Sequence, residues 1–256
     1  MPVISIAIQK GGSGKTTTTI NLAAALQRMG HSVLLIDADP QASLTEALGI
    51  RNEPSKNLFT EISHEIRGED SHPDEAIIQT ASGLMLLPSS IELAWAELEL
   101  VGVYGREQVF GWILEKITEK YDFIFFDCPP SVGMLSVNAL AASQHILMPV
   151  QAEYLPKKAV HSFMHHLRAL KKMNKQLSVL GIVLTQFDER LTMAKKVWND
   201  LEKDYGDKMF STHIRKNNQL ARAQEEGMDI FHYAVHSHGA EDYQHLAEEF
   251  LSRLSA

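Results

Sequence analysis

The sequence predicts an α/β fold, in which a twisted, mostly parallel β-sheet carries helices on both faces. Short apolar runs alternate with stretches of helical periodicity, which is the pattern of consecutive βαβ units. These runs are apolar almost throughout, as expected for strands that are covered on both sides. With 256 residues, of which 45% are hydrophobic, the chain can bury one sizeable core. We therefore expect residues 1–256 to form a single domain.

Six apolar runs are the expected strands. They cover residues 3–8, 33–36, 84–87, 123–126, 145–150 and 180–184. Helical periodicity predicts a helix after the first strand that stops near Gly30, and further helices at 105–120, 159–173, 193–204 and 240–254. One side of the last helix is expected to face the core, and it consists of Tyr243, Leu246, Phe250 and Leu254. Residues 51–82 are more polar and predict small helices and loops.

The single cysteine, Cys128, restricts the classes of protein to which the chain can belong. One cysteine cannot form a disulfide within the chain, which fits a reducing cytoplasm, and it cannot supply the ligands of an iron–sulfur cluster. No apolar run approaches the roughly 18 residues of a transmembrane helix, and the first residues lack the pattern of a signal peptide. We expect a cytoplasmic protein that does not enter a membrane.

A glycine-rich segment between the first strand and the first helix is the strongest functional signal. It reads Lys10-Gly11-Gly12-Ser13-Gly14-Lys15-Thr16-Thr17. Glycines let the backbone wrap around phosphate oxygens, and the helix N-terminus adds a partial positive charge. In such a loop Lys15 reaches the β- and γ-phosphates, Thr16 binds Mg²⁺ through its hydroxyl, and Thr17 contacts the α-phosphate. The sequence therefore predicts a P-loop NTPase domain.

Two more strands are expected to deliver aspartates to the same edge of the sheet. Asp37 and Asp39 follow the strand at 33–36, and Asp127 follows the strand at 123–126. Ligands of open parallel sheets bind at the carboxyl ends of the strands. Asp127 is suited to hold Mg²⁺ through a water molecule. Asp37 either orients the shell of the Mg²⁺ or caps its own loop.

Several motifs resemble the ParA/Soj branch of the deviant Walker ATPases, which are relatives of MinD. They are KGGSGKTT, LLIDADPQ, FIFFDCPPS and, at residues 148–154, MPVQAEY. As in that branch, a second lysine, Lys10, precedes the glycines, while Gln9 occupies the first glycine position of the usual loop. The resemblance extends from Val3 through the last helix. It is to the short form, without the N-terminal helix-turn-helix of longer plasmid-type relatives.

The resemblance implies an ATP- and Mg²⁺-dependent ATPase that forms a homodimer around two nucleotides. It further implies that Lys10 reaches the partner's nucleotide, that Gly11 lies where the subunits approach closely, and that Asp39 positions the attacking water. The catalytic residues are then Lys10, Lys15 and Asp39. Intrinsic turnover is expected to be slow, and a ParB-like or other cargo adaptor protein is expected to accelerate it.

Basic residues are concentrated in one part of an acidic chain. The net charge is −8, yet residues 157–222 contain 14 lysines and arginines against 6 aspartates and glutamates. Such asymmetry predicts a local face that binds the DNA backbone without sequence preference, and hence association with the nucleoid. The expected DNA contacts are Lys195, Lys196, Arg215, Lys216 and Arg222. Arg215-Lys216-Asn217 stands where ParA-like proteins usually carry Pro-Arg-Asn.

Two other classes of function compete with this interpretation. A MinD-like regulator that cycles on membranes needs a basic amphipathic C-terminal helix, whereas residues 246–256 are acidic and short. A metabolic P-loop enzyme, such as an iron–sulfur reductase or an amide synthase, is the other class. The single cysteine disfavours the reductase, and an amide synthase needs neither Lys10 nor a basic face.

Overall fold

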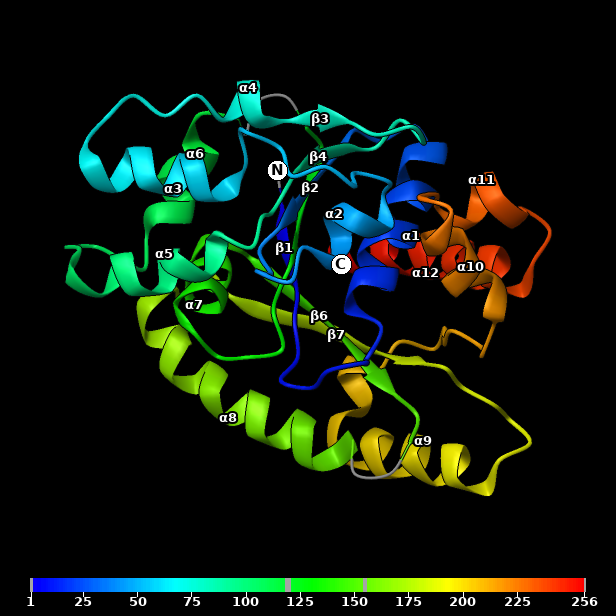
Figure 1. Cartoon of the computed structure of the whole chain (residues 1–256). Coiled ribbons are helices and arrows are strands. Elements are labelled where there is room, and N and C mark those ends of the chain that lie inside the picture. Colours follow the sequence, from blue (N-terminus) through cyan, green and yellow to red (C-terminus); the bar gives the residue numbers. More distant parts are fainter. Residues whose placement is uncertain (1, 118–120, 154–155, 256) are drawn as a thin grey trace.

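A seven-stranded sheet runs through the middle of the molecule (Figure 1). The structure is a computed structural model that describes residues 2–117, 121–153 and 156–255. The strands are β1 (Val3–Ile6), β2 (Val33–Asp37), β3 (Ile78–Gln79), β4 (Met85–Leu87), β5 (Phe123–Asp127), β6 (His145–Gln151) and β7 (Ser178–Thr185). Their order is β3-β4-β2-β5-β1-β6-β7, and each neighbouring pair is parallel except the antiparallel pair β3 and β4.

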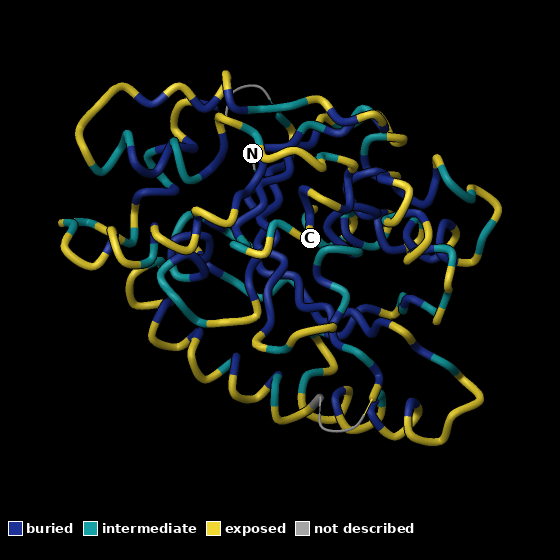
Figure 2. Tube along the Cα trace, in the orientation of Figure 1, coloured by how far each residue is buried: buried dark blue, intermediate teal, exposed yellow. Residues whose placement is uncertain are grey.

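Helices cover both faces of the sheet, as predicted. One face carries α1 (Lys15–Arg28), α2 (Ser43–Ala47), α10 (Asn218–Glu225), α11 (Ile230–Ala234) and α12 (His238–Leu254). The other carries α3 (Leu58–Arg67), α4 (Pro73–Ala76), α5 (Leu93–Glu99), α6 (Val109–Glu115), α7 (Met134–Ala142), α8 (Pro156–Met173) and α9 (Thr192–Tyr205). Figure 2 shows the strands as a buried layer between these helices.

The core is divided by the sheet into two apolar clusters. In β2, Leu34 and Ile36 belong to one cluster, while Val33 and Leu35 belong to the other. Successive side chains of a strand point to opposite faces, so a strand that is buried on both sides must be apolar at every position. This packing explains why the strands appear in the sequence as continuous apolar runs.

The six predicted strands are confirmed, with small shifts at their ends. Strand β3 was not predicted, because two residues are too few to show a period, and β3 pairs with β4 only at the edge of the sheet. The predicted helix at 105–120 begins later, at Val109, because Gly105 adopts a left-handed φ of 69° and closes a turn with Gln108. Residues 118–120 of that prediction lie outside the described residues.

The last helix packs as predicted. Tyr243, Leu246 and Phe250 of α12 are fully buried, and Leu254 packs half-buried against the same cluster. The apolar side of α12 is therefore occupied by α1 and the sheet. Within the part of the chain that the structure describes, no helix is both long enough and apolar enough to cross a bilayer.

The parallel register brings three loops to one edge of the sheet. Asp127 at the end of β5 lies beside Ile6 of β1 and beside Asp37 of β2. The pairing continues past the strands, because Ala38 donates its N–H to the carbonyl of Asp127 at 3.0 Å and Cys128 donates to the carbonyl of Ile6 at 3.3 Å. The segments that follow β1, β2 and β5 therefore leave the sheet together.

Candidate active site

The glycine-rich loop joins β1 to α1 and leaves the first turn of α1 without a side-chain cap. Gly12 and Gly14 adopt left-handed φ angles of 68° and 86°, which favour glycine over residues with a β-carbon. Thr185 of β7 holds the loop by donating its hydroxyl to the carbonyl of Ser13 at 2.8 Å. The N–H groups at the start of α1 thus remain available to an anion, and the helix dipole favours negative charge there.

Lys15 is buried beneath the loop. Its residue exposure is 8%, and its ammonium donates to the carbonyl of Lys10 at 3.4 Å. A buried cation with one long hydrogen bond to a neutral acceptor is incompletely compensated, so contact with a phosphate group would be strongly favoured. Lys10 is itself only half-buried.

Thr16 and Asp127 form a close polar pair at the floor of the site. The Thr16 hydroxyl donates to Asp127 at 2.6 Å, and Thr19 donates to the other carboxylate oxygen at 3.3 Å. Burial raises the pKa of Asp127 to about 6, although the bond from Thr16 and the charge of Lys15 oppose the shift. A hydroxyl beside a buried carboxylate is the oxygen donor set that Mg²⁺ prefers, so these residues fit a magnesium ion.

Asp37 is engaged by its own loop. One of its carboxylate oxygens accepts from the backbone N–H of Thr45 at 2.8 Å and from the Thr45 hydroxyl at 2.7 Å. Burial and the nearby charge of Asp127 raise the pKa of Asp37 to about 7. From the sequence, Asp37 either orients the shell of the Mg²⁺ or caps its own loop. These contacts favour the capping role, because they fix the first turn of α2 and the segment that contains Asp39.

The predicted phosphate-binding residues surround one cavity of about 400 Å³. It is lined by the continuous segment from Gly11 to Thr17 and by Asp39 and Pro130 from the loops after β2 and β5. Asp39 is held in a tight turn, where its carboxylate accepts from the N–H of Gln41 at 2.9 Å. The structure therefore assembles the loop, Lys15, Thr16 and Asp39 at a single place.

Four lining residues were not singled out from the sequence, namely Ser43, Ala47, Gln186 and Gln224. Gln224 of α10 accepts from the hydroxyl of Thr17, across 207 positions of sequence. Gln186, after β7, has a positive φ of 51°. Ser43, Ala47 and Gln224 also line an adjoining cavity of about 800 Å³, so there is room beside the phosphate loop for a nucleoside. No local sequence pattern distinguishes a glutamine that lines a cavity from any other glutamine.

Four of the five predicted DNA-contact residues are exposed. Lys195 and Lys196 lie on the outer side of α9, Lys216 lies in the segment before α10, and Arg222 lies on α10. Lys196 also lines a groove of about 720 Å³ between α8 and α9, together with Lys157 and Lys158. Their side chains are thus accessible to phosphate groups.

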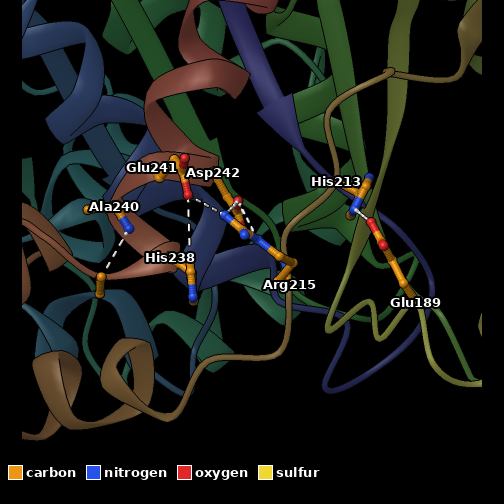
Figure 3. Close-up of polar contacts among 8 residues, drawn as sticks. Glu189, His213, Arg215, His238, Ala240, Glu241 and Asp242 are labelled. Carbon is orange, nitrogen blue, oxygen red and sulfur yellow. Dashed lines mark hydrogen bonds and ion pairs between the residues drawn. The ribbon is translucent and has the colours of Figure 1, made fainter.

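Arg215, the fifth, is engaged within the chain (Figure 3). Its guanidinium donates to Asp242 at 2.5 and 2.9 Å and to Glu241 at 2.6 Å, and its backbone N–H donates to Asp242 at 2.8 Å. These acceptors raise its pKa further above the ordinary arginine range. The geometry gives Arg215 a structural contact with the start of α12, and a role in binding DNA stays a prediction.

Comparison with known proteins places these features in a family. A family model described as an AAA domain matches residues 1–179. The chromosome-partitioning ATPase Soj of Thermus thermophilus is 39% identical over 254 residues, which cover 98% of this chain and 96% of that protein. The sporulation initiation inhibitor protein Soj of Bacillus subtilis is 38% identical over 249 residues, covering 96% and 97%.

Solved structures agree with the sequence relatives on the fold. The cobyrinic acid a,c-diamide synthase of Mycobacterium smegmatis, with bound ADP and magnesium, is 32% identical and superposes with a TM-score of 0.84, over 100% of this chain and 96% of that one. The chain has a strand–loop–helix geometry with aspartates at the ends of β2 and β5, and it is 38% and 39% identical to two Soj proteins over nearly its full length. The chain therefore belongs to the ParA/Soj family of deviant Walker ATPases.

Proposed function

We propose that this chain is a partitioning ATPase that dimerises around ATP and Mg²⁺, binds DNA without sequence preference, and releases it after partner-stimulated hydrolysis. An ATPase role in partitioning is supported by the Soj and ParA relatives, at 34–39% identity over nearly the full chain. The observation that carries the proposal is the convergence of Lys15, Thr16 and Asp39 on one cavity under the glycine-rich loop.

The site is suited to phosphoryl transfer because it supplies positive charge and orientation, which are what this reaction requires. The loop N–H groups and Lys15 neutralise the phosphate oxygens. Thr16 and Asp127 would hold Mg²⁺, which adds further positive charge when it is bound. Asp39 orients a water molecule whose oxygen forms the new bond to the γ-phosphorus. The bond to the β,γ-bridging oxygen breaks, and the electron pair leaves with ADP.

A second copy of the chain completes this site in the proposed dimer. Gly11 and Gly12 are exposed at the outer edge of the loop, so a second molecule can approach the bound phosphates closely. Among the residues that the structure describes, the Lys10 ammonium has no hydrogen-bond or ion-pair partner, in keeping with the proposed contact to the nucleotide of the other copy. Each subunit then contributes its Lys10 ammonium group to its partner's site.

The basic face provides the DNA-binding part of the proposal. Lys195, Lys196, Lys216 and Arg222 are exposed and would contact the phosphate backbone, which gives affinity without base recognition. The membrane-cycling alternative finds no support in α12, because the apolar side of this helix is buried in the core and cannot lie on a bilayer.

The Asp39→Ala variant tests the proposal. Without a residue that orients water, we expect hydrolysis to fall by about 100-fold while ATP stays bound. The variant should then accumulate as a dimer that is retained on random-sequence DNA and not on anionic lipid vesicles. Sedimentation, DNA pull-down and vesicle pull-down with ATP or ADP measure each step. Parent-like hydrolysis by the variant refutes the role of Asp39, and retention on vesicles alone favours the membrane class.

A further inference from the structure

An apolar ridge of five exposed side chains runs along α5 and the short 3-10 helix η1 (Leu100–Gly102). The exposed fractions are Ile91 69%, Trp95 62%, Leu98 66%, Val101 61% and Tyr104 99%. Spacings of three or four residues place these side chains on one side of the segment, and the opposite side is buried in the core. Large apolar side chains that gather on a surface mark an interaction site more often than chance exposure does.

The segment that leads into α5 is hydrogen-bonded to the loop that contains Asp39. The Ser89 hydroxyl donates to the carbonyl of Asp39 at 2.7 Å. The backbone N–H of Ser89 donates to the Thr45 hydroxyl at 2.9 Å, and that hydroxyl donates to Asp37. A change in the position of the Asp39 loop is therefore transmitted to the first residues of the ridge.

The far end of α5 contacts the loop that follows Asp127. The Glu97 carboxylate accepts from the N–H of Leu135 at 3.5 Å, in the first turn of α7. A β-carbon at Gly133 would lie 2.0 Å from the Glu97 carboxylate, so the Glu97 side chain would have to move if this glycine were replaced. Pro130 in the same loop lines the phosphate cavity. Two of the loops that line this cavity therefore contact the segment that carries the ridge.

The ridge is continuous with the edge of the molecule where the nucleotide site opens. Ile91 lines the cavity of about 800 Å³ that shares Ser43, Ala47 and Gln224 with the phosphate cavity. The ridge also has exposed charges of opposite sign, with Glu92 near one end and Arg106 beyond the other. Where the two-fold axis is perpendicular to the ridge, the ridge meets its copy in the opposite direction, so each Glu92 approaches the Arg106 of the other molecule.

We propose that this ridge is the docking surface for a second copy of the chain, and that bound ATP enables docking through the Asp39 and Pro130 loops. The inference rests on the proposed ATP-dependent dimer and adds the surface that holds it together. Docking would depend on the nucleotide because the same two loops line the phosphate cavity and contact the segment that carries the ridge.

Trp95 reports directly on the coverage of the ridge. The chain has three tryptophans, so replacing Trp112 and Trp198 by phenylalanine leaves Trp95 as the only one. In the full chain with Mg²⁺ and a slowly hydrolysed ATP analogue, we expect Trp95 emission to shift to shorter wavelength and acrylamide quenching to fall several-fold. Both changes should depend on protein concentration and follow the dimer fraction measured by sedimentation. With ADP, Trp95 should remain exposed.

Replacing two residues of the ridge tests its contribution to dimerisation. Trp95→Ser with Leu98→Ser should weaken the ATP-dependent dimer by at least about 30-fold, the size of an interface hot spot. Binding of a fluorescent ATP analogue to the monomer should stay unchanged, because neither side chain lines the phosphate cavity. Met173→Ser with Val235→Ser is the matched control, since these apolar side chains are 54% and 42% exposed outside the ridge.

The outcomes separate this inference from the proposed function. A parent protein that dimerises with ATP while Trp95 stays accessible overturns the inference and leaves the proposed function intact. The inference is equally overturned if the double serine variant dimerises as tightly as the parent and the control. A parent protein that remains monomeric with ATP under all conditions overturns both.

Discussion

Lys10 and Lys15 carry the same functional group in different surroundings. Lys15 is 8% exposed under the loop, and its position relative to the phosphate cavity is fixed by the backbone of its own chain. Lys10 is half-buried at the outer rim, and only its carbonyl contacts Lys15. These surroundings fit the proposed roles, in which Lys15 contacts the nucleotide of its own subunit and Lys10 that of a second subunit.

Replacing each lysine by alanine should separate nucleotide binding from dimerisation. Lys15→Ala removes one or two charge-assisted hydrogen bonds to phosphate, so we expect ATP affinity to fall by about 10- to 100-fold. Lys10→Ala should bind ATP like the parent at protein concentrations where only monomer is present, and it should fail to dimerise. Calorimetric titration and sedimentation measure the two properties. Unchanged ATP affinity of Lys15→Ala would contradict the assignment.

Two buried carboxylates lie side by side at the ends of β2 and β5. Asp37 and Asp127 are neighbours in the strand register, and burial raises the pKa of Asp37 to about 7 and that of Asp127 to about 6. Ionisation of both carboxyl groups in a buried place is unfavourable unless a cation is bound beside them. A cation at the proposed Mg²⁺ site beside Asp127 would lower this cost, and Thr45 compensates part of it at Asp37.

At the scale of elements, the start of α12 is held by one arginine. Arg215 pairs with Asp242, whose side chain is only 6% exposed, and with Glu241. The segment between η3 (Gly206–Lys208) and α10 runs beside β7 without forming a regular strand, with isolated bridges at Met209 and Arg215. Phe210 and Ile214 donate their N–H groups to β7 at 2.8 Å, and Arg215 then ties the end of this segment to α12.

Arg215→Ala should destabilise the protein, whereas Lys216→Ala should not. Removing the guanidinium leaves the buried Asp242 carboxylate with the backbone N–H of residue 215 as its remaining donor there, which costs on the order of 2 kcal/mol. Lys216 is exposed, so its loss should weaken DNA binding and leave the free energy of unfolding unchanged. Urea unfolding and DNA titration of both variants provide the comparison. Parent-like stability of Arg215→Ala would show that the ion pair contributes little.

At the scale of the molecule, charge is distributed unevenly over one fold. Residues 157–222 are basic while the whole chain has a net charge of −8, so DNA is expected to be attracted to the surface of this segment and repelled elsewhere. This distribution should keep non-specific DNA binding weak in each monomer and make it sensitive to salt. Dimerisation would double the number of basic groups that can reach one DNA duplex, which links ATP binding to DNA binding.

The salt dependence of DNA binding should become weaker when basic residues are removed from the proposed DNA-binding surface. A variant with alanine at Lys195, Lys196, Lys216 and Arg222 should reduce the slope of log K against log salt by about 0.9 for each phosphate that is no longer neutralised. Fluorescence anisotropy with a labelled duplex over a range of KCl measures the slope. Lys56→Ala with Lys116→Ala is the control, because these lysines pair with Glu75 and Glu65 outside that face. An equal reduction of slope in the control would refute a localised DNA surface.

Much of the fold and the centre of the candidate site follow from local sequence patterns. Each buried strand is a continuous apolar run, and Asp37 and Asp127 stand directly at strand ends, so parallel pairing alone brings them together. The phosphate loop is a contiguous segment whose glycines identify it. The edge strand β3 and the late start of α6 were not predicted correctly, because two residues show no period and the turn at Gly105 interrupts the helical pattern.

Local sequence is sufficient to specify six of the strands, which loop is suited to phosphate and which carboxylates flank it. Other features emerge only in the folded chain: Gln186 and Gln224 line the cavity, Arg215 pairs with α12, and Trp95 and Leu98 of α5 face outward. The difference lies in the range of the interactions. Period, propensity and glycine conformation act between near neighbours in the chain, whereas exposure and ion pairing depend on segments that meet only after the whole sheet has formed.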